Sequence, residues 1–294
     1  MRRRRGVLIA AVAALALVAA ACTPNPSPAG PAPLRYRDAI FADVTQTADV
    51  VFGSSVDQQG QTVTLLADVY EPVGDVITAR PLAIWVHGGG FSGGTKSSPE
   101  IVDQATEFAR KGYVTASIDY RVDSPGCSTA TPGASCLQAI INATEDAQTA
   151  VRYFRANAAT YGIDPGRIAI GGSSAGAIIA LNVGYSGENP APGDHQGYSH
   201  AVKAAQSISG AALLSGPIGA GDAAAIFFHN KVDPLVSRAW ADNTYNSAIA
   251  AGLPAVFYSW EGLGHVPYPW HRQQILDMTR NWYYTYLDLA NAPQ

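Results

Sequence analysis

Short apolar runs alternate with longer amphipathic runs along most of this chain, and this alternation limits the possible folds more than any other feature. The strand-like runs are residues 62–70, 82–86, 113–118, 168–170, 224–228 and 255–260, and the helix-like runs are 136–161, 175–183 and 270–289. Strands that alternate with helices form a mostly parallel sheet with helices on both faces, joined by right-handed crossovers. The sequence therefore predicts an α/β fold of this kind.

The longest helix-like run, 136–161, has apolar residues spaced three and four apart, as one buried face of a helix requires. They are Ile140, Ala143, Ala147, Val151 and Phe154. Only 14% of the 294 residues are charged, against about 25% in an average globular protein, so a large core is expected and disorder is not. Because no linker-like break follows residue 33, we predict one domain over 45–294.

The N-terminus has the pattern of a signal peptide. Residues 2–5 are all arginine and 6–21 are apolar, a stretch shorter than the ~20 residues that a spanning helix needs. Cys22 follows at once, and the run 18–22 resembles a bacterial lipobox, although Ala19 stands where leucine is more typical. We therefore predict a signal peptide over 1–21, export, and membrane attachment through a lipidated Cys22. The alternative is a secreted protein with a free thiol there.

Residues 22–44 contain many prolines and serines and are predicted to form a tether. The remaining cysteines, Cys127 and Cys136, bracket a short polar loop. In an oxidising compartment they are expected to pair, and the alternative is two free thiols. No histidine lies near them, so no metal site is predicted. The formal net charge of −4 disfavours nucleic-acid binding, which needs clustered lysine and arginine.

A candidate nucleophile lies between the strand-like run 168–170 and the helix-like run 175–183. Residues 172–176 read Gly-Ser-Ser-Ala-Gly and fit G-x-S-x-G, in which Ser174 occupies a strained turn that lifts its hydroxyl above the sheet. Ser173 would need glycine at position 175, which is alanine. The alternative is that either serine only caps the helix.

Donors for a developing oxyanion are expected in the glycine run that follows the strand 82–86. Acyl transfer needs at least two aligned N–H groups, one of them from the residue after the nucleophile. This pattern selects Gly89, Gly90 and Ala175. An ordinary flexible loop is the alternative, and His87 is expected to hold the loop rather than to react.

The general base should come last in the chain. His265 lies in a loop between the last strand-like run and the last helix-like run, at the sheet edge where such folds place their chemistry. His271 is the alternative. The remaining histidines are assigned to packing or to polar loops; they are His87, His195, His200 and His229.

The acid that orients the base should lie between Ser174 and His265 in sequence. Asp233 fits best, because it follows a buried strand, and its role would be to hold the imidazole in one tautomer. Its alternative role is to cap the loop before Pro234. Other acids fit less well by position; they are Asp194, Asp222, Asp242 and Glu261.

Six blocks in this order resemble the α/β-hydrolase superfamily, in particular its bacterial carboxylesterase and lipase branch, including the BD-FAE-like feruloyl esterases. They are His87-Gly-Gly-Gly-Phe, Asp119-Tyr-Arg121, Tyr161 to Ile168, Gly172-x-Ser174-Ala-Gly176, His229-x4-Pro234 and Gly264-His265-Val-Pro. The resemblance implies the α/β-hydrolase fold, the roles given above, and structural roles for Asp119 and Arg121. The chain departs at Ser173, where hormone-sensitive-lipase relatives usually carry Asp or Glu, and at Ala177, where a second glycine is common. The N-terminal helical cap of those relatives is not expected here.

These features together predict a serine carboxylic-ester hydrolase that works through an acyl-enzyme and needs no metal or organic cofactor. Its substrate would be a small-molecule or polymer-attached ester. A non-catalytic surface lipoprotein is the first alternative, and acyltransferase or peptidase activity on the same residues is the second. The loops 123–136 and 186–200 are candidates to border the substrate pocket. Trp260, Tyr268 and Trp270 flank His265 and are candidates to stack on an aromatic acyl group, but core packing is the alternative that we favour.

Overall fold

The computed structural model describes residues 25–123, 126–127, 133–188, 191–214 and 216–294. The predicted signal peptide and the predicted lipidation at Cys22 lie outside the described residues. Within these ranges, no helix has both the length and the apolar character needed to cross a bilayer.

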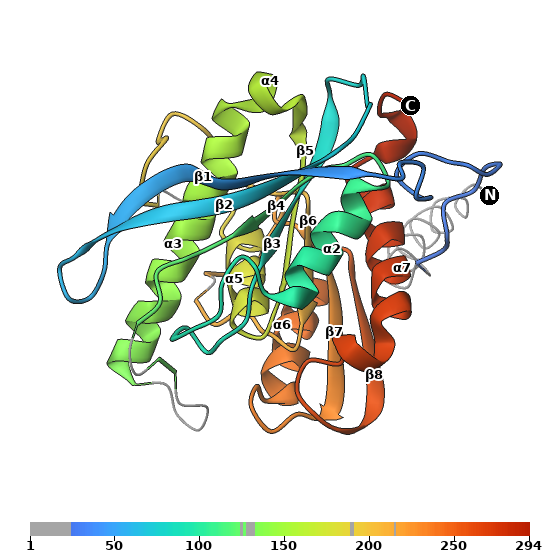
Figure 1. The fold of residues 1–294 in the computed structure, drawn as a ribbon. Coiled ribbons are helices and arrows are strands. Elements are labelled where there is room, and N and C mark those ends of the chain that lie inside the picture. Colours follow the sequence, from blue (N-terminus) through green and yellow to red (C-terminus); the bar gives the residue numbers. More distant parts are fainter. Residues whose placement is uncertain (1–24, 124–125, 128–132, 189–190, 215) are drawn as a thin grey trace, which may run out of the picture.

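Eight strands of the described chain form one sheet in the order β1-β2-β4-β3-β5-β6-β7-β8 (Figure 1). Their bounds are β1 (Val44–Val56), β2 (Thr62–Pro72), β3 (Arg80–Val86), β4 (Val114–Ile118), β5 (Ile163–Ser173), β6 (Ala204–Ile208), β7 (Ala224–Val232) and β8 (Ala255–Leu263). β2 pairs antiparallel with both β1 and β4, and every other neighbouring pair is parallel. The mostly parallel sheet is therefore confirmed.

Helices cover both faces of this sheet (Figure 1). They are α2 (Pro99–Ala109), α3 (Ala134–Ala156), α4 (Ala158–Tyr161), α5 (Ala175–Gly184), α6 (Arg238–Ala250) and α7 (Tyr268–Tyr286), followed by the short 3-10 helix η2 (Leu289–Asn291). α2 and α7 contribute to one buried cluster, and α3, α5 and α6 to the other. In the described part of the chain, no group of helices forms a separate cap domain over the sheet.

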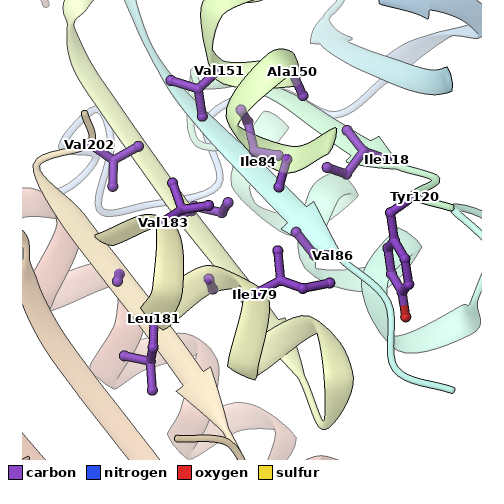
Figure 2. Packing of buried hydrophobic residues seen from close by; sticks show 14 of the residues in the cluster. Ile84, Val86, Ile118, Tyr120, Ala150, Val151, Ile179, Leu181, Val183 and Val202 are labelled. Atoms are coloured by element: carbon purple, nitrogen blue, oxygen red, sulfur yellow. The ribbon is translucent and has the colours of Figure 1, made fainter. Parts of the chain in front are cut away.

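The two clusters arise because successive side chains of a strand point to opposite faces. On β3, Ile84 and Val86 pack towards α3 and α5 (Figure 2). The residue between them, Trp85, points the other way, and its ring lies 5.1 Å from Phe108 and 6.0 Å from Tyr283. All five side chains are fully buried. The sheet is thus held from both sides, which fixes its carboxyl edge as a rigid base for loops.

Part of the predicted tether contacts the rest of the chain. The side chain of Tyr36 is fully buried, and its hydroxyl donates a hydrogen bond to the carbonyl oxygen of Pro293 at 2.8 Å. Asn25 donates to the carbonyl oxygen of Met278 on α7 at 2.7 Å, and Arg35 pairs with Asp75. These contacts hold parts of 25–44 against the rest of the described chain, whereas most side chains of 26–33 are exposed.

Two strands were not predicted from the sequence. β1 is an edge strand whose side chains are mostly exposed, so it lacks the regular apolar alternation of a half-buried strand. β6 has the sequence Ala-Ala-Gln-Ser-Ile, which lacks the apolar run expected of a buried strand, yet all five residues are buried. The turn-forming sequence Asp-Pro-Gly at 164–166 lies within β5, where the pairing with β3 shifts register.

Candidate active site

Ser174 occupies the sharp turn between β5 and α5. Its backbone angles are φ 53° and ψ −119°, a conformation that a residue with a side chain adopts only at a cost in strain. Its N–H donates to the carbonyl oxygen of Ile208 at 2.8 Å, which ties the turn to the end of β6. The hydroxyl makes no capping hydrogen bond to α5, so the helix-cap alternative is not what the structure shows.

The glycines on either side of this turn are required by close backbone contacts. A Cβ atom added to Gly172 would lie 2.5 Å from the carbonyl oxygen of Val86, and one added to Gly176 would lie 2.0 Å from the same atom. Real Cβ atoms do not approach this closely. The two glycines therefore let β5 and the first turn of α5 pack against the end of β3.

His265 and Asp233 meet Ser174 at the carboxyl edge of the sheet. The Nε2 atom of His265 lies 2.7 Å from Oγ of Ser174, and its Nδ1 atom lies 2.8 Å from Oδ2 and 3.0 Å from Oδ1 of Asp233. A carboxylate can only accept, so the neutral ring carries its proton on Nδ1. Nε2 is then free to accept the proton of the serine hydroxyl.

The carboxylate of Asp233 is fully buried. Its Oδ1 accepts hydrogen bonds from the N–H groups of Leu235 and Val236, at 2.9 and 3.0 Å. Burial alone would raise its pKa, but hydrogen bonds from His229, His265 and these two N–H groups outweigh burial and hold the pKa well below its usual range. The ionised form of Asp233 is therefore favoured, and it can stabilise a positive charge on His265.

His229 is a part of this arrangement that the sequence did not reveal. The sequence predicts only a packing role for this histidine, and its Nε2 atom lies 3.0 Å from the carbonyl oxygen of Val236. The same atom also lies 3.2 Å from Oδ2 of Asp233. The ring is 1% exposed, so both contacts are shielded from water. The one signal in the sequence was that His229 precedes Asp233 by four residues at the end of a strand.

The glycine loop after β3 faces the same turn. Gly89 and Gly90 both have positive φ angles, 125° and 61°, which only glycine adopts without strain. Together with Ala175, they line one cavity with Ser174. No backbone acceptor within the described ranges is found for the N–H group of Gly89, Gly90 or Ala175. These three N–H groups therefore lie beside Ser174 without a backbone partner in the described part of the chain.

Several contacts hold this loop in place. The ring of His87 stacks on Tyr120 at 4.3 Å, its Nδ1 atom lies 2.6 Å from the carbonyl oxygen of Gly88, and the Tyr120 hydroxyl donates to the carbonyl oxygen of His87. Burial lowers the pKa of His87, against smaller opposing effects of Gly88 and Asp119. At the far end of the loop, the N–H of Lys96 donates to Asp119 at 2.6 Å. These contacts agree with the supporting roles predicted for His87 and Asp119.

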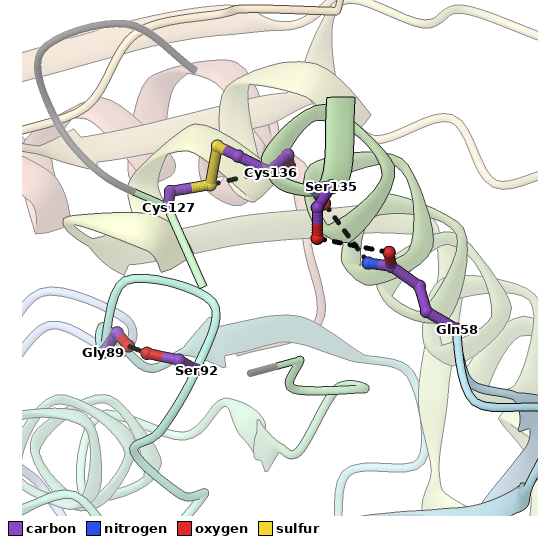
Figure 3. The surroundings of a disulfide bond; sticks show 6 residues. All are labelled: Gln58, Gly89, Ser92, Cys127, Ser135 and Cys136. Atoms are coloured by element: carbon purple, nitrogen blue, oxygen red, sulfur yellow. Dashed lines mark hydrogen bonds between the residues drawn. A yellow bond between two sulfur atoms is a disulfide. The ribbon is translucent and has the colours of Figure 1, made fainter. Parts of the chain in front are cut away.

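Cys127 and Cys136 form a disulfide beside the glycine loop (Figure 3). The N–H of Cys127 donates to the carbonyl oxygen of Gly90 at 3.0 Å. The hydroxyl of Ser92 donates to the carbonyl oxygen of Gly89 at 3.3 Å, which supports the residue before Gly90. The disulfide therefore connects the first turn of α3 to the proposed oxyanion donors.

A cavity of about 830 Å³ opens at Ser174. Both cysteines of the disulfide line it, as the loop 123–136 suggested, whereas no described residue of 186–200 does. Of the three aromatic residues that flank His265 in sequence, Trp270 lines the cavity and is 70% exposed. The other two do not line it, because Trp260 stacks on His271 and Tyr268 is buried. Among the described residues, no group of three or more His, Cys, Asp and Glu side chains is placed to hold a metal ion.

Glu100 is a second feature that the sequence did not reveal. It lies in the first turn of α2, lines the cavity, and accepts a hydrogen bond from the hydroxyl of Ser173. Burial raises its pKa, although the hydrogen bond from Ser173 and the nearby His265 act in the opposite direction. The acid that relatives usually carry at position 173 is thus absent here, and α2 supplies a carboxyl group beside that serine.

The other candidate acids and histidines lie apart from Ser174. Asp242 pairs with Arg238, and Glu261 pairs with Lys231. Asp194 and Asp222 accept hydrogen bonds from the N–H groups of Ser54 and Gly219. His195 lies near the carbonyl oxygen of Phe52, and His200 is buried away from the cavity. Arg121 bonds to both oxygens of Asp146 at 2.9 Å, in the supporting role expected of it.

A family model described as BD-FAE matches residues 67–218, slightly more than half of the chain. The chain is 35% identical over 104 residues to fumonisin B1 esterase of Sphingopyxis macrogoltabida, and 35% identical over 108 residues to chlorogenic acid esterase of Aspergillus niger. These segments cover 33% and 36% of this chain but only 18% and 20% of the two relatives, so the chain spans about a fifth of their length.

Solved structures of esterase 2 from Thermogutta terrifontis share the fold. The form phosphoramylated by tabun has a TM-score of 0.68 and 22% sequence identity, covering 85% of this chain and 97% of that one. A butyrate-bound form has a TM-score of 0.66 at the same identity, covering 82% and 96%. The architecture is therefore the α/β-hydrolase fold, and the chain belongs to the BD-FAE family of α/β-hydrolase esterases.

Proposed function

We propose that this protein hydrolyses carboxylic esters through an acyl-enzyme formed on Ser174. One observation carries the proposal. The hydroxyl of Ser174 lies 2.7 Å from Nε2 of His265, whose Nδ1 lies 2.8 Å from a buried carboxylate oxygen of Asp233. A nucleophile, a base and an orienting acid are thus within hydrogen-bond distance of one another, as this chemistry requires.

In the first step, Oγ of Ser174 attacks the ester carbonyl carbon while His265 takes the hydroxyl proton on Nε2. The carbonyl oxygen becomes negatively charged, and the N–H groups of Gly89, Gly90 and Ala175 stabilise it. His265 then gives its proton to the alcohol oxygen as the carbon–oxygen bond breaks. The alcohol leaves, and the acyl group remains bonded to Ser174.

In the second step, water replaces the alcohol. His265 takes a proton from the water as it attacks the acyl carbonyl carbon, and the same three N–H groups stabilise the new oxyanion. His265 returns the proton to Oγ of Ser174 when the acid is released. Asp233 stays ionised throughout, holding the ring and stabilising its positive charge.

The N-terminal sequence and the disulfide support an exported protein. The arginine-rich start and the apolar run of 6–21 match a signal peptide, and a disulfide persists best in an oxidising compartment. Attachment through a lipidated Cys22 would place the enzyme at a membrane surface, where small-molecule and polymer-attached esters are both accessible.

Hydrolysis of p-nitrophenyl acetate, butyrate and octanoate by the purified protein tests the proposal. Wild type should turn these esters over, and Ser174→Ala should retain only background activity. The exposed serine Ser54, on the edge strand β1, provides the control, because Ser54→Ala should match wild type. A folded wild type without activity on any ester would favour the non-catalytic alternative, and transfer to an added alcohol in preference to water would favour an acyltransferase.

A further inference from the structure

A second cavity, of about 330 Å³ and open to the surface, adjoins the active-site cavity. Leu213 and Trp240 line both cavities, so these two side chains form the partition between them. The second cavity is further lined by the segment that follows β6 and by α6, through Ala212, Gly216, Pro217, Ile218, Asn243, Thr244 and Ser247. The mechanism proposed above uses neither this cavity nor the partition.

The active-site cavity has a buried side and an exposed side. The buried side is apolar, and its exposed fractions are only 1% for Ile140, 5% for Ile178 and 7% for Val236. The partly buried side chains of Leu213 and Trp240 pack against the same cluster, on the face of the sheet covered by α3, α5 and α6. The other side is formed by the starts of α2 and α7, where Trp270 is 70% exposed.

The sequence of the two reaction steps indicates which part of the substrate occupies each side of the active-site cavity. The alcohol must leave and water must enter between the two steps, so the alcohol needs the exposed side. The acyl group stays bonded to Ser174 through both steps and can remain on the apolar side. The buried side, which ends at Leu213 and Trp240, therefore suits an aliphatic acyl chain.

The backbone around the partition is fixed by hydrogen bonds. Oδ1 of Asn182 on α5 accepts from the N–H groups of Leu213 and Leu214, at 3.0 and 3.2 Å. Oγ1 of Thr244 on α6 accepts from the N–H of Ala212 at 3.1 Å. Because the main chain is anchored to two helices, the distance from Ser174 to the end of the acyl site depends on the side chains of Leu213 and Trp240.

We propose that Trp240, together with Leu213, ends the acyl-binding site, and that the cavity behind it is an unused extension of that site. The protein therefore selects aliphatic acyl groups that end at Trp240 and discriminates against longer ones. This inference rests on the proposed esterase function, which it makes specific.

The test compares kcat/KM for p-nitrophenyl esters from acetate to dodecanoate between wild type and Trp240→Ala. Each additional buried methylene contributes roughly fourfold to kcat/KM, so two or more methylenes in the second cavity give at least about tenfold. We expect the preferred chain to lengthen by two carbons or more. A series of alkyl acetates, in which only the alcohol varies, should show no such change.

Two further variants test whether a change in chain-length preference comes from the partition or from a general loosening of the fold. Tyr245 is also an aromatic residue of α6, but it packs on Phe227 and Phe257 and lines neither cavity. Tyr245→Ala should leave the chain-length preference as in wild type. Ile218→Trp, added to Trp240→Ala, refills the second cavity and should restore the wild-type preference.

The inference is overturned if Trp240→Ala folds and hydrolyses esters with the chain-length preference of wild type. It is also overturned if Tyr245→Ala lengthens the preferred chain equally, or if only the alcohol series responds. Each of these results leaves ester hydrolysis by wild type intact. Failure of the proposed function would differ, because wild type itself would then turn over no ester, or Ser174→Ala would be as active as wild type.

Discussion

The Nε2 atom of His229 lies 3.2 Å from Oδ2 of Asp233, the same oxygen that accepts a hydrogen bond from His265. Each carboxylate oxygen therefore has more than one partner, because Oδ1 also accepts from two backbone N–H groups. A carboxylate held in this way has little freedom to rotate. We infer that His229 is a positioning residue that fixes the acid on which the orientation of His265 depends.

Replacing His229 with alanine should lower kcat while leaving KM nearly unchanged, because the substrate contacts are not altered. A hydrogen bond to a charged group contributes about 1.5–3 kcal/mol, which corresponds to a loss of roughly 10- to 150-fold in kcat. Steady-state kinetics with p-nitrophenyl butyrate measure the effect. His195→Ala, at a histidine away from the cavity, should keep the wild-type kcat.

A conservative variant distinguishes positioning from packing. The side-chain amide of His229→Gln can still donate a hydrogen bond to Asp233, so this variant should recover most of the lost kcat. His229→Leu fills the space without a donor and should not recover it. Equal activity of the glutamine and leucine variants would show that His229 only packs.

The disulfide should contribute both to stability and to turnover. The double variant Cys127→Ser, Cys136→Ser should lose somewhat less than about 3 kcal/mol in the free energy of unfolding, as expected for so short a loop. The variant should also lose kcat, because the disulfide fixes the backbone of Cys127, whose N–H donates to the carbonyl oxygen of Gly90. Urea unfolding and ester kinetics measure the two effects. Reduction of wild type should reproduce both losses, and a reduced wild type with unchanged kcat would refute the link to the glycine loop.

Glu100 should make stability depend on pH in a defined direction. Its pKa is raised in the folded protein, so between its unfolded value of about 4.3 and its folded value the native state binds more protons. This group therefore lowers the free energy of unfolding as pH rises through that window. Glu100→Gln removes the effect, so its stability relative to wild type should increase from pH 4 to pH 7. A difference that stays constant or decreases with pH would be inconsistent with a raised pKa.

Gly176→Ala should be strongly destabilising. The added Cβ would lie 2.0 Å from the carbonyl oxygen of Val86, so the end of β3 or the start of α5 has to move. Overpacking of this kind typically costs about 1–3 kcal/mol or more. The control is Gly197→Ala, since an added Cβ meets nothing within 4 Å there. Thermal unfolding should separate the two variants clearly, and equal melting temperatures would contradict the close packing described here.

Local patterns were sufficient to predict the sheet class and to select the residues that meet at Ser174. The motif around Ser174 and the positions of Asp233 and His265 at strand ends are properties of short segments, and parallel strands bring their carboxyl ends to one edge. Contacts between distant segments could not be derived in this way. Glu100 approaches Ser173 across 73 positions. Gln206 is buried in β6 because it donates to Gln104 on α2, 102 positions away.

The most direct test of the central claim is to label the nucleophile. A short exposure to diethyl p-nitrophenyl phosphate should add one diethylphosphoryl group, and peptide mass spectrometry should place it on Ser174. Ser174→Ala should take no label, and loss of ester hydrolysis in wild type should match the labelled fraction. Label on another residue, with hydrolysis lost in proportion, would show that Ser174 is not the nucleophile.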